Sequence, residues 1–340
     1  MAYCIKVRKK NAEKAKRYLV RNGLFNRGYK VFSRKSFIYF PILHVPNGKD
    51  AKVLKTLGSV EVEDFERGSI KSYKDLLTEE FRDIEKLPTG YDLLGNIAVI
   101  DAEAGDAKRI ARIVIRVNKG VETVVRKAGA VTGLYRTRRY LYVLGKKNFI
   151  SRYKENNCLF VFDIRKVFFS TRLAYERQRI SKLVKKDEQV IVMFAGVGPF
   201  AIEIAKAMPS SKVIAMELNK HAYEAMLNNI KLNHVENVIP ELGDVNRLAA
   251  RHKNFADRIV MPLPKDSYNF LGAVLAVAKP NCIVHYYTFG SKESAFEDSE
   301  KRLREFFNMH GVKIRIVGKR VVRPYSAKEV EIVMDFKLVK

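Results

Sequence analysis

Two glycines and two acidic residues fall at intervals that suit the binding of a ligand containing adenosine. The segment "FAGVGPF" (194–200) places Gly196 and Gly198 between an apolar run and a helical pattern. Glycine at such a turn lets the chain bend tightly and lets a ligand approach the backbone. Glu217 ends the next apolar run, where an acid can accept hydrogen bonds from ribose hydroxyls. Asp244, in "LGDV", ends the third run and can reach an adenine edge.

The glycine turn fits two ligands. With Ala201 as a third small residue it satisfies the dinucleotide pattern GxGxx(G/A), whereas S-adenosylmethionine uses the same turn without a pyrophosphate. Pro199 removes one N–H donor from the first helical turn, which weakens a phosphate cradle and favours S-adenosylmethionine. A third possibility is a turn that binds no ligand. Glu217 and Asp244, which end the next two apolar runs at the positions expected of ligand contacts, argue against it.

A stiff loop follows the fourth apolar run of the same region. In "MPLPK" (261–265), Pro262 and Pro264 fix φ and lack an N–H, so the segment cannot continue a sheet ladder. Enzymes that modify nucleobases with S-adenosylmethionine use (N/D/S)-x-P-(P/L) at this place to hold a flipped, planar base. The segment is therefore either an ordinary loop or the wall of a base pocket.

These motifs need a sheet that brings the ends of several strands together. Strand-like and helical segments alternate through residues 166–340, and the strands are almost continuously apolar. This pattern predicts a doubly wound α/β domain with a parallel sheet, whose ligands bind at the carboxyl ends of the strands. The expected helices are 171–184, 199–209, 220–233 and 267–280, and the expected strands are 189–196, 212–218, 238–244 and 282–290. Residues 255–264 are expected to form a strand followed by a loop.

Two smaller α+β modules are expected before this domain. Residues 1–67 combine a helix over 11–23, which Gly23 ends, with paired strands over 30–42. The charged, irregular residues 68–90 are expected to be a linker. Residues 91–165 form the second module, with strands over 93–101 and 122–129, a helix over 106–120 and a further strand pair over 158–170 that runs into the next domain.

The charge balance points to a polyanionic partner. The chain of 340 residues has 64 Lys and Arg against 37 Asp and Glu, a formal net charge of +27. Its first forty residues hold many basic and aromatic side chains but a single acid, Glu13. Nucleic acid is the first candidate, and solubility or thermal adaptation is the alternative.

The cysteines, histidines and apolar residues restrict the kinds of site and the cellular compartment that are expected. Cys4, Cys158 and Cys282 are far apart and the six histidines are scattered, so neither a metal site nor a disulfide framework is expected. This cysteine usage fits a reducing, intracellular compartment. With 47% apolar residues, the chain has enough for packed cores, yet it has no apolar run that approaches a membrane span.

The ordered motifs resemble one enzyme family. "YRTR", "VFFSTRLAYERQRI", "MFAGVGPFAIEIAK", "LNNIKLN", "MPLPK" and "HYYTFG" occur in this order, and the basic N-terminal segment is similar as well. Together they resemble the archaeal and eukaryotic tRNA (guanine-N1)-methyltransferases that act on guanosine 37, beside the anticodon. The likeness spans essentially the whole chain. It implies a Rossmann-like methyltransferase domain preceded by two RNA-binding modules.

The resemblance implies roles for particular residues. Guanine N1 carries a proton, so its methylation needs a base and a cation that holds the charge shifting onto O6. By resemblance, Glu176 is the base and Arg136 the O6 partner; an ordinary exposed helix acid is the alternative for Glu176. The implied base pocket consists of Pro262, Leu263, Pro264 and Arg138. Arg138 and Arg139 are also expected to contact phosphate.

The resemblance also implies the cofactor and the partner. S-adenosylmethionine is the expected methyl donor, and core packing is the alternative role for the aromatic residues among its expected contacts. The partner is tRNA: the N-terminal module is expected to dock on its elbow and the middle module to guide the anticodon stem. We expect a cytoplasmic monomer without metal. The implied cofactor contacts are Phe168, Arg172, Arg177, Phe194, Gly196, Val197, Gly198, Phe200, Glu217, Leu218, Asp244 and Val245.

Two positions depart from the family pattern. Pro262 stands where the family commonly has Asn, and Val192 stands where the strand usually ends in Asp. Both changes favour an alternative, an enzyme that also C-methylates 4-demethylwyosine, the tricyclic derivative of the same guanosine. "FAGVGPF" and the basic N-terminal module are instead typical of single-reaction enzymes. Two remoter alternatives are an NAD-dependent dehydrogenase and an RNA-binding protein without activity.

Overall fold

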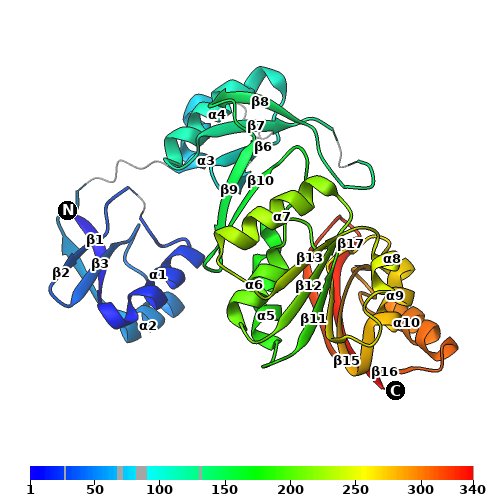
Figure 1. Cartoon of the computed structure of the whole chain (residues 1–340). Helices are drawn as coiled ribbons and strands as arrows, with labels where there is room; N and C mark the ends of the chain where they lie inside the picture. Colours follow the sequence, from blue (N-terminus) through cyan, green and yellow to red (C-terminus); the bar gives the residue numbers. More distant parts are fainter. Residues whose placement is uncertain (27, 67–71, 82–89, 130–131, 340) are drawn as a thin grey trace. The chain divides into compact units, whose positions relative to one another are not determined.

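The computed structural model describes residues 1–26, 28–66, 72–81, 90–129 and 132–339 (Figure 1). The chain folds as two compact units. The first comprises residues 1–90 with 109–119, and the second comprises residues 91–108 with 120–340.

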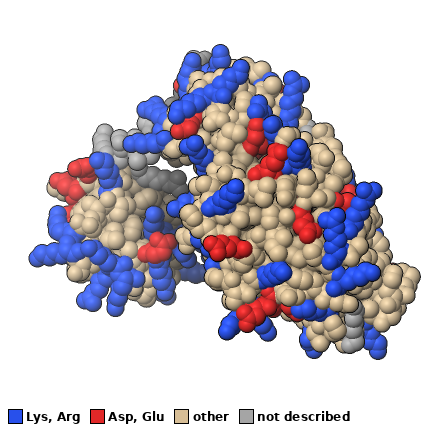
Figure 2. Space-filling model, in the orientation of Figure 1, with Lys and Arg blue, Asp and Glu red and all other residues tan. Residues whose placement is uncertain are grey.

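The first unit contains a four-stranded antiparallel sheet in the order β2-β3-β1-β4. Helix α1 buries Ala15 and Leu19, and Gly23, with φ of +66°, lies just beyond its end, as the sequence predicts. Lys and Arg side chains stand out over the surface of this unit (Figure 2). Its elements are β1 (Ala2–Arg8), α1 (Ala12–Arg21), β2 (Phe32–Arg34), β3 (Phe37–Pro41), α2 (Gly48–Leu57) and β4 (Gly58–Glu63).

The stretch expected as a linker contains a helix. Helix α3 (Tyr73–Glu80) begins with a capping box, in which Ser72 and Asp75 each accept the other's backbone N–H. Leu76 and Leu77 of this helix are buried. Residues 68–71 and 82–89 of the expected linker lie outside the described residues. The predicted helix over 106–120 is present as α4 (Ala104–Val117).

The second unit begins with a four-stranded sheet in the order β5-β6-β7-β8. The single strand predicted over 93–101 is wrong, because the chain forms a hairpin there. Gly95 makes the turn with φ of +60°, and a Cβ at this position would lie 2.0 Å from the Arg152 carbonyl oxygen. The strands are β5 (Tyr91–Leu94), β6 (Ile97–Ile100), β7 (Thr123–Lys127) and β8 (Tyr140–Gly145).

The strand pair predicted over 158–170 is also wrong. Only β10 (Cys158–Asp163) lies there, and its antiparallel partner β9 (Ile150–Glu155) precedes it. Asn156 and Asn157 connect them with φ of +43° and +61°, the left-handed conformations that a two-residue hairpin turn requires. Asparagine tolerates this conformation better than most residues, which is the local reason for the turn.

The rest of the second unit is the predicted doubly wound domain. Its seven-stranded sheet has the order β13-β12-β11-β14-β15-β17-β16, with parallel pairing from β13 to β15. The antiparallel hairpin β16–β17, beyond residue 290, was not predicted. The elements are α5 (Ala174–Leu183), β11 (Gln189–Met193), α6 (Pro199–Ala207), β12 (Lys212–Glu217), α7 (Lys220–Leu232), β13 (Val238–Leu242), α8 (Val245–Ala249), β14 (Ala256–Met261), α9 (Leu271–Val277), β15 (Ala278–Ser291), α10 (Glu297–Met309), β16 (Lys313–Pro324) and β17 (Glu329–Val339).

Each face of this sheet carries its own apolar core. Val190 and Val192 of β11 pack on the side of α6 and α7, whereas Ile191 and Met193 pack on the side of α8, α9 and α10. Figure 1 shows these helices on opposite faces of the sheet. Because both faces are covered, the strand is continuously apolar, as a parallel strand between two helix layers must be.

A chain of buried ionic side chains ties α5 to the sheet; we call it the buried ion-pair chain. Asp335 accepts from Arg179 of α5 at 2.6 Å and contacts Nδ1 of His285 at 2.6 Å. His285 Nε2 lies 2.8 Å from a guanidinium nitrogen of Arg258. Burial disfavours the Asp335 carboxylate, but His285 and Arg179 outweigh it and lower the pKa of Asp335 to about 2. The full chain is Glu176, Arg179, Asp335, His285, Arg258 and Glu188.

His285 is the titratable member of this chain near neutral pH. Burial lowers the pKa of His285, and the cations Arg258 and Arg179 lower it further, against the opposing effect of Asp335. The folded protein therefore binds fewer protons here than the unfolded chain once the pH falls below the ordinary histidine pKa of about 6.5. The stability that neutral His285 supports is present above this pH and is lost below it.

We expect His285→Gln to flatten the pH dependence of the free energy of unfolding between about pH 7 and pH 5, because it removes this proton uptake. Urea unfolding at several pH values measures the slope. His44→Gln, at an exposed histidine of the first unit, is the matched control and should keep the wild-type slope. An unchanged slope in His285→Gln would contradict this role.

Candidate active site

A cavity of about 160 Å³ lies at the carboxyl ends of β11, β12 and β14, beside the start of α8. This is the edge where ligands bind in sheets of this type. The structure thus brings together most of the residues that the sequence analysis selected, from six separate segments of the chain. Those that line the cavity are Arg136, Phe168, Phe194, Gly196, Glu217, Leu218, Asp244, Val245, Pro262 and Leu263.

The glycine turn and Glu217 are joined by a hydrogen bond. The Gly196 N–H donates to Glu217 Oε2 at 2.6 Å, and the Asn219 N–H donates to Oε1 at 2.7 Å. Burial raises the pKa of Glu217, and these backbone donors oppose the rise. Each carboxylate oxygen keeps acceptor capacity beyond one bond, so Glu217 can still accept from a ligand in the cavity.

Phe194 holds an unusual backbone conformation beside the cavity. Its φ of +56° is in the left-handed region, which costs a non-glycine residue about 1–2 kcal/mol. The ring packs edge-on against Phe270 with centroids 4.7 Å apart, and both side chains line the cavity. Strain of this kind persists only where the surroundings impose it, and it concentrates at functional sites.

Asp244 does not end the third strand, as expected from the sequence, because β13 stops at Leu242. It is the N-cap of α8, where Oδ1 accepts the backbone N–H groups of Asn246 and Arg247. The cap fixes the carboxylate at the cavity wall.

A tight turn presents Arg136. The Arg136 N–H donates to the Gly133 carbonyl, and Thr132 and Thr137 pair across the turn. Arg136 has φ of +52°, and its guanidinium carbon lies 5.1 Å from the centroid of the Phe168 ring. The cation is thus held over an aromatic face at the cavity, where it can donate to a ligand oxygen.

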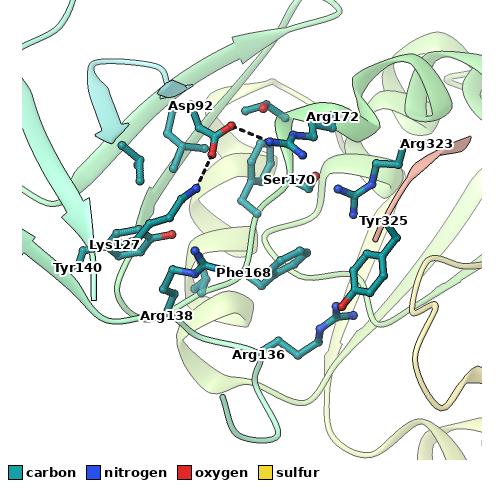
Figure 3. Close-up of a pocket in the computed structure, with 15 residues that line it drawn as sticks. Asp92, Lys127, Arg136, Arg138, Tyr140, Phe168, Ser170, Arg172, Arg323 and Tyr325 are labelled. Atoms are coloured by element: carbon teal, nitrogen blue, oxygen red, sulfur yellow. Dashed lines mark hydrogen bonds and ion pairs between the residues drawn. The ribbon is translucent and has the colours of Figure 1, made fainter. Parts of the chain in front are cut away.

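Several predicted residues lie away from this cavity. Arg177 is 2% exposed and pairs with Glu155 and Glu203, its Nε being 2.5 Å from Glu155 Oε1. Arg138 and Arg172 line a neighbouring cavity, where Arg172 pairs with Asp92 at 3.1 Å (Figure 3). Four further predicted residues are buried and do not line either cavity: Val197, Gly198, Phe200 and Pro264.

Glu176 is also 2% exposed and is not among the residues that line either cavity. Its Oε2 accepts from Arg179 at 3.0 Å and from the Tyr287 hydroxyl at 2.9 Å. Its Oε1 faces Arg320 Nε at 3.0 Å, but within the described residues neither of these two atoms makes a hydrogen bond. Arg320 lies over the exposed ring of Tyr175, 4.4 Å from its centroid.

Sequence reasoning missed five residues of the cavity wall. Asn219 is the N-cap of α7, and its position two residues after Glu217 was an available signal. Tyr135 adjoins Arg136 in the turn, whereas no local pattern singles out the other three. The missed residues are Leu134, Tyr135, Asn219, Ala222 and Phe270.

The described residues contain neither a metal-binding cluster nor a membrane-spanning helix. No group of three or more His, Cys, Asp and Glu there is placed to hold a metal ion. None of the helices in these residues combines the length and apolar character needed to cross a membrane.

Comparisons with known proteins place the chain among tRNA-modifying enzymes. The family model "TRM5/TYW2 methyltransferase domain" matches residues 151–315, "tRNA methyltransferase 5 N-terminal domain" matches residues 4–50, and "TYW2 N-terminal domain" matches residues 73–148. The chain is 35% identical to tRNA (guanine(37)-N(1))-methyltransferase Trm5b of Pyrococcus abyssi, over 99% of both chains. It is 31% identical to tRNA 4-demethylwyosine(37)-methyltransferase Taw21 of Saccharolobus solfataricus, over 77% of this chain and 98% of that relative.

Solved structures similar to this chain also include tRNA-modifying enzymes. The chain is similar to aTrm5 in its complex with tRNALeu, with a TM-score of 0.71, 30% identity and 99% of each chain covered. It is also similar to TYW2 of M. jannaschii in complex with AdoMet, with a TM-score of 0.60 and 25% identity, over 74% of this chain and 100% of that one.

The two glycines of the turn differ in the space around their Cα atoms, so their alanine variants should differ in stability. At Gly198, with φ of +89°, a Cβ would lie 2.8 Å from Met226 Cγ and 3.1 Å from Ile202 Cδ1. We expect Gly198→Ala to lower the free energy of unfolding by about 2–4 kcal/mol, from backbone strain and overpacking together. At Gly196, with φ of +58°, a Cβ meets nothing within 4 Å, so Gly196→Ala should cost only about 1–2 kcal/mol from the backbone. Denaturant unfolding of both variants checks the order, and equal losses would contradict it.

Proposed function

Because the chain belongs to the TRM5/TYW2 methyltransferase family, we propose that it transfers a methyl group from S-adenosylmethionine to N1 of guanosine 37 in tRNA. The observation that carries the proposal is that one cavity at the sheet edge joins the glycine turn, Glu217 and Asp244 with Arg136 and Pro262. The family assignment removes the dehydrogenase reading of the glycine turn.

The cavity residues fit S-adenosylmethionine, which would supply an electrophilic methyl group. At Gly196 the backbone faces open space, so a ligand can approach it closely. Glu217 can accept from ribose hydroxyls, because its two bonds to backbone N–H groups leave acceptor capacity on both oxygens. Phe194 and Phe270 provide an apolar wall. Arg177, buried against Glu155 and Glu203, serves packing of the domain instead of direct contact.

Arg136 is the residue that we assign to guanine O6. As the N1 proton leaves, negative charge develops on O6, and a fixed guanidinium donor stabilises it. Arg keeps its charge at any working pH and donates in a planar fork. The turn and the stacking on Phe168 hold the guanidinium in place before the guanine binds.

Glu176 is the residue that we assign to the N1 proton, which it accepts on Oε1. Oε2 is already held by Arg179 and Tyr287, so Oε1 is the oxygen left to accept the proton. Arg320 faces this oxygen from an exposed position, with its side chain 40% accessible to solvent. The guanidinium of Arg320 therefore moves aside when the guanine enters, and this movement exposes Oε1 of Glu176.

The two smaller modules supply the contacts to the rest of the tRNA in this proposal. Residues 1–67 are basic and aromatic, and they dock on the tRNA elbow through backbone and shape recognition. Residues 91–165 guide the anticodon stem toward residues 166–340, which contain the cavity. The enzyme acts in the cytoplasm as a monomer, and its three cysteines are unpaired.

We expect Glu176→Gln to reduce methyl transfer by about 10²–10⁴-fold, the usual contribution of a general base, while tRNA binding is retained. Mass spectrometry of nucleosides from a treated tRNA transcript measures N1-methylguanosine, and filter binding measures the affinity. Glu224→Gln, at an exposed glutamate on α7, is the control and should keep full activity. Full activity of Glu176→Gln would remove Glu176 from this role.

A second activity on the tricyclic base is supported by Pro262. This residue lines the cavity where the family commonly has Asn, and a proline side chain neither donates nor accepts at a guanine edge. Loss of a polar contact loosens selection between guanine and its larger derivative. The likeness to Taw21 is consistent with this alternative.

We expect Pro262→Asn to raise the preference for guanosine over the 4-demethylwyosine nucleotide, measured as the ratio of kcat/KM on the two tRNAs. A gain of about tenfold corresponds to one polar contact of 1.4 kcal/mol. Leu263→Met, which changes the neighbouring wall residue without adding an amide, is the control. If the wild-type protein leaves the tricyclic tRNA unmethylated, the second activity is absent.

A further inference from the structure

We infer that a second cavity, which adjoins the first, binds a nucleotide that flanks the methylated guanosine. This inference rests on the proposed function. The second cavity has a volume of about 300 Å³ and shares Arg136 and Phe168 with the first (Figure 3). Its other walls come from β5, β6, β7, the segment leading into and starting β8, the segment before α5 and the C-terminal hairpin, so it draws together distant parts of the second unit.

The cavity has an excess of positive charge. Five basic residues line it against one acid, Asp92, which lies 3.5 Å from Lys127 and 3.1 Å from Arg172. Figure 3 shows Asp92 between these two cations. Arg323 is offset by the buried Glu331, 2.6 Å away. Among the described residues, Arg136 and Arg138 have no ion-pair partner, so at least these two charges are left for an external anion such as a phosphodiester. The basic residues are Lys127, Arg136, Arg138, Arg172 and Arg323.

The cavity also offers an aromatic platform. Tyr325 is half exposed, and its ring packs on Phe289 with centroids 4.2 Å apart and an interplanar angle of 36°. Its backbone N–H donates to Glu329 at 3.0 Å, which closes the turn between β16 and β17. A supported, half-exposed ring beside cations is the arrangement on which proteins stack unpaired bases.

The placement of the charge favours a flanking nucleotide over the target itself. The target must reach the first cavity, where the methyl donor is proposed to bind, and Arg136 stands between the two cavities. A third cavity borders both Arg136 and Tyr325. Its other charged lining residues are Lys265 and Asp266, whose charges are opposite, so it has a smaller excess of positive charge than the second cavity. The phosphodiester next to a guanosine held at Arg136 is therefore best accommodated in the second cavity, with its base on Tyr325.

The test pairs Tyr325→Ala with tRNAs that lack the base on the 5′ or the 3′ side of guanosine 37. The measured quantity is kcat/KM for formation of N1-methylguanosine. For one of the two sides, we expect removal of the base to cost the wild-type protein about tenfold, and Tyr325→Ala to cost about tenfold on intact tRNA. The two changes together should also cost about tenfold, because both remove the same contact.

Two controls separate this contact from a general loss. Tyr325→Phe keeps the ring and should restore the wild-type response to the missing base. Tyr142→Ala, at an exposed tyrosine on β8 outside the cavity, should combine multiplicatively with the missing base. The inference is overturned if Tyr325→Ala combines multiplicatively with the missing base on both sides. Failure of the proposed function would instead appear as no N1-methylguanosine from the wild-type protein on intact tRNA.

Discussion

The second unit depends on the buried ion-pair chain that runs from Glu176 to Glu188. Removing one partner of a buried pair leaves an uncompensated charge and costs about 3–5 kcal/mol, whereas an apolar replacement of the whole chain would often be as stable. Stability alone therefore does not account for it. Arg179, itself paired with Asp335, fixes Glu176 Oε2 on α5, and this leaves Oε1 in one defined position. The same chain orients His285 through hydrogen bonds at both ring nitrogens.

The site depends further on backbone conformations that most residues avoid. Phe194 and Arg136 both have positive φ, and they lie on separate segments that meet at the cavity. The turn around Phe194 is imposed by Gly196 and Gly198 and by the Ala195 N–H, which donates to the Met216 carbonyl at 2.8 Å. A side chain in such a conformation has few alternatives to its observed direction. The ring and the guanidinium are thus placed before any ligand binds, which lowers the entropy lost on binding.

The sequence allowed much of this to be predicted, because the parallel strands are apolar on both faces and their carboxyl ends carry the polar residues. What it could not show follows from interactions between distant segments. The family resemblance implied that Arg177 contacts the cofactor, but Glu155 and Glu203 enclose its side chain. The hairpin at Gly95 had a local signal, since Gly95-Asn96 between two apolar runs is typical of a two-residue turn, but its close approach to Arg152 had none. Tyr325 reaches the second cavity only because β17 inserts between β15 and β16.

Burial of Glu176 imposes an order on the proposed reaction. An exposed carboxylate would be available to any nucleobase, whereas Oε1 here is buried against Arg320 Nε at 3.0 Å, so the proposed proton transfer requires Arg320 to move first. The energy for this displacement must come from contacts that the tRNA makes elsewhere, at the basic modules and beside Arg136, since the purine alone offers few. Binding energy from remote parts of a substrate is then used to assemble the catalytic groups, a form of induced fit. A free guanosine, which lacks those contacts, would leave Arg320 in place and Glu176 covered.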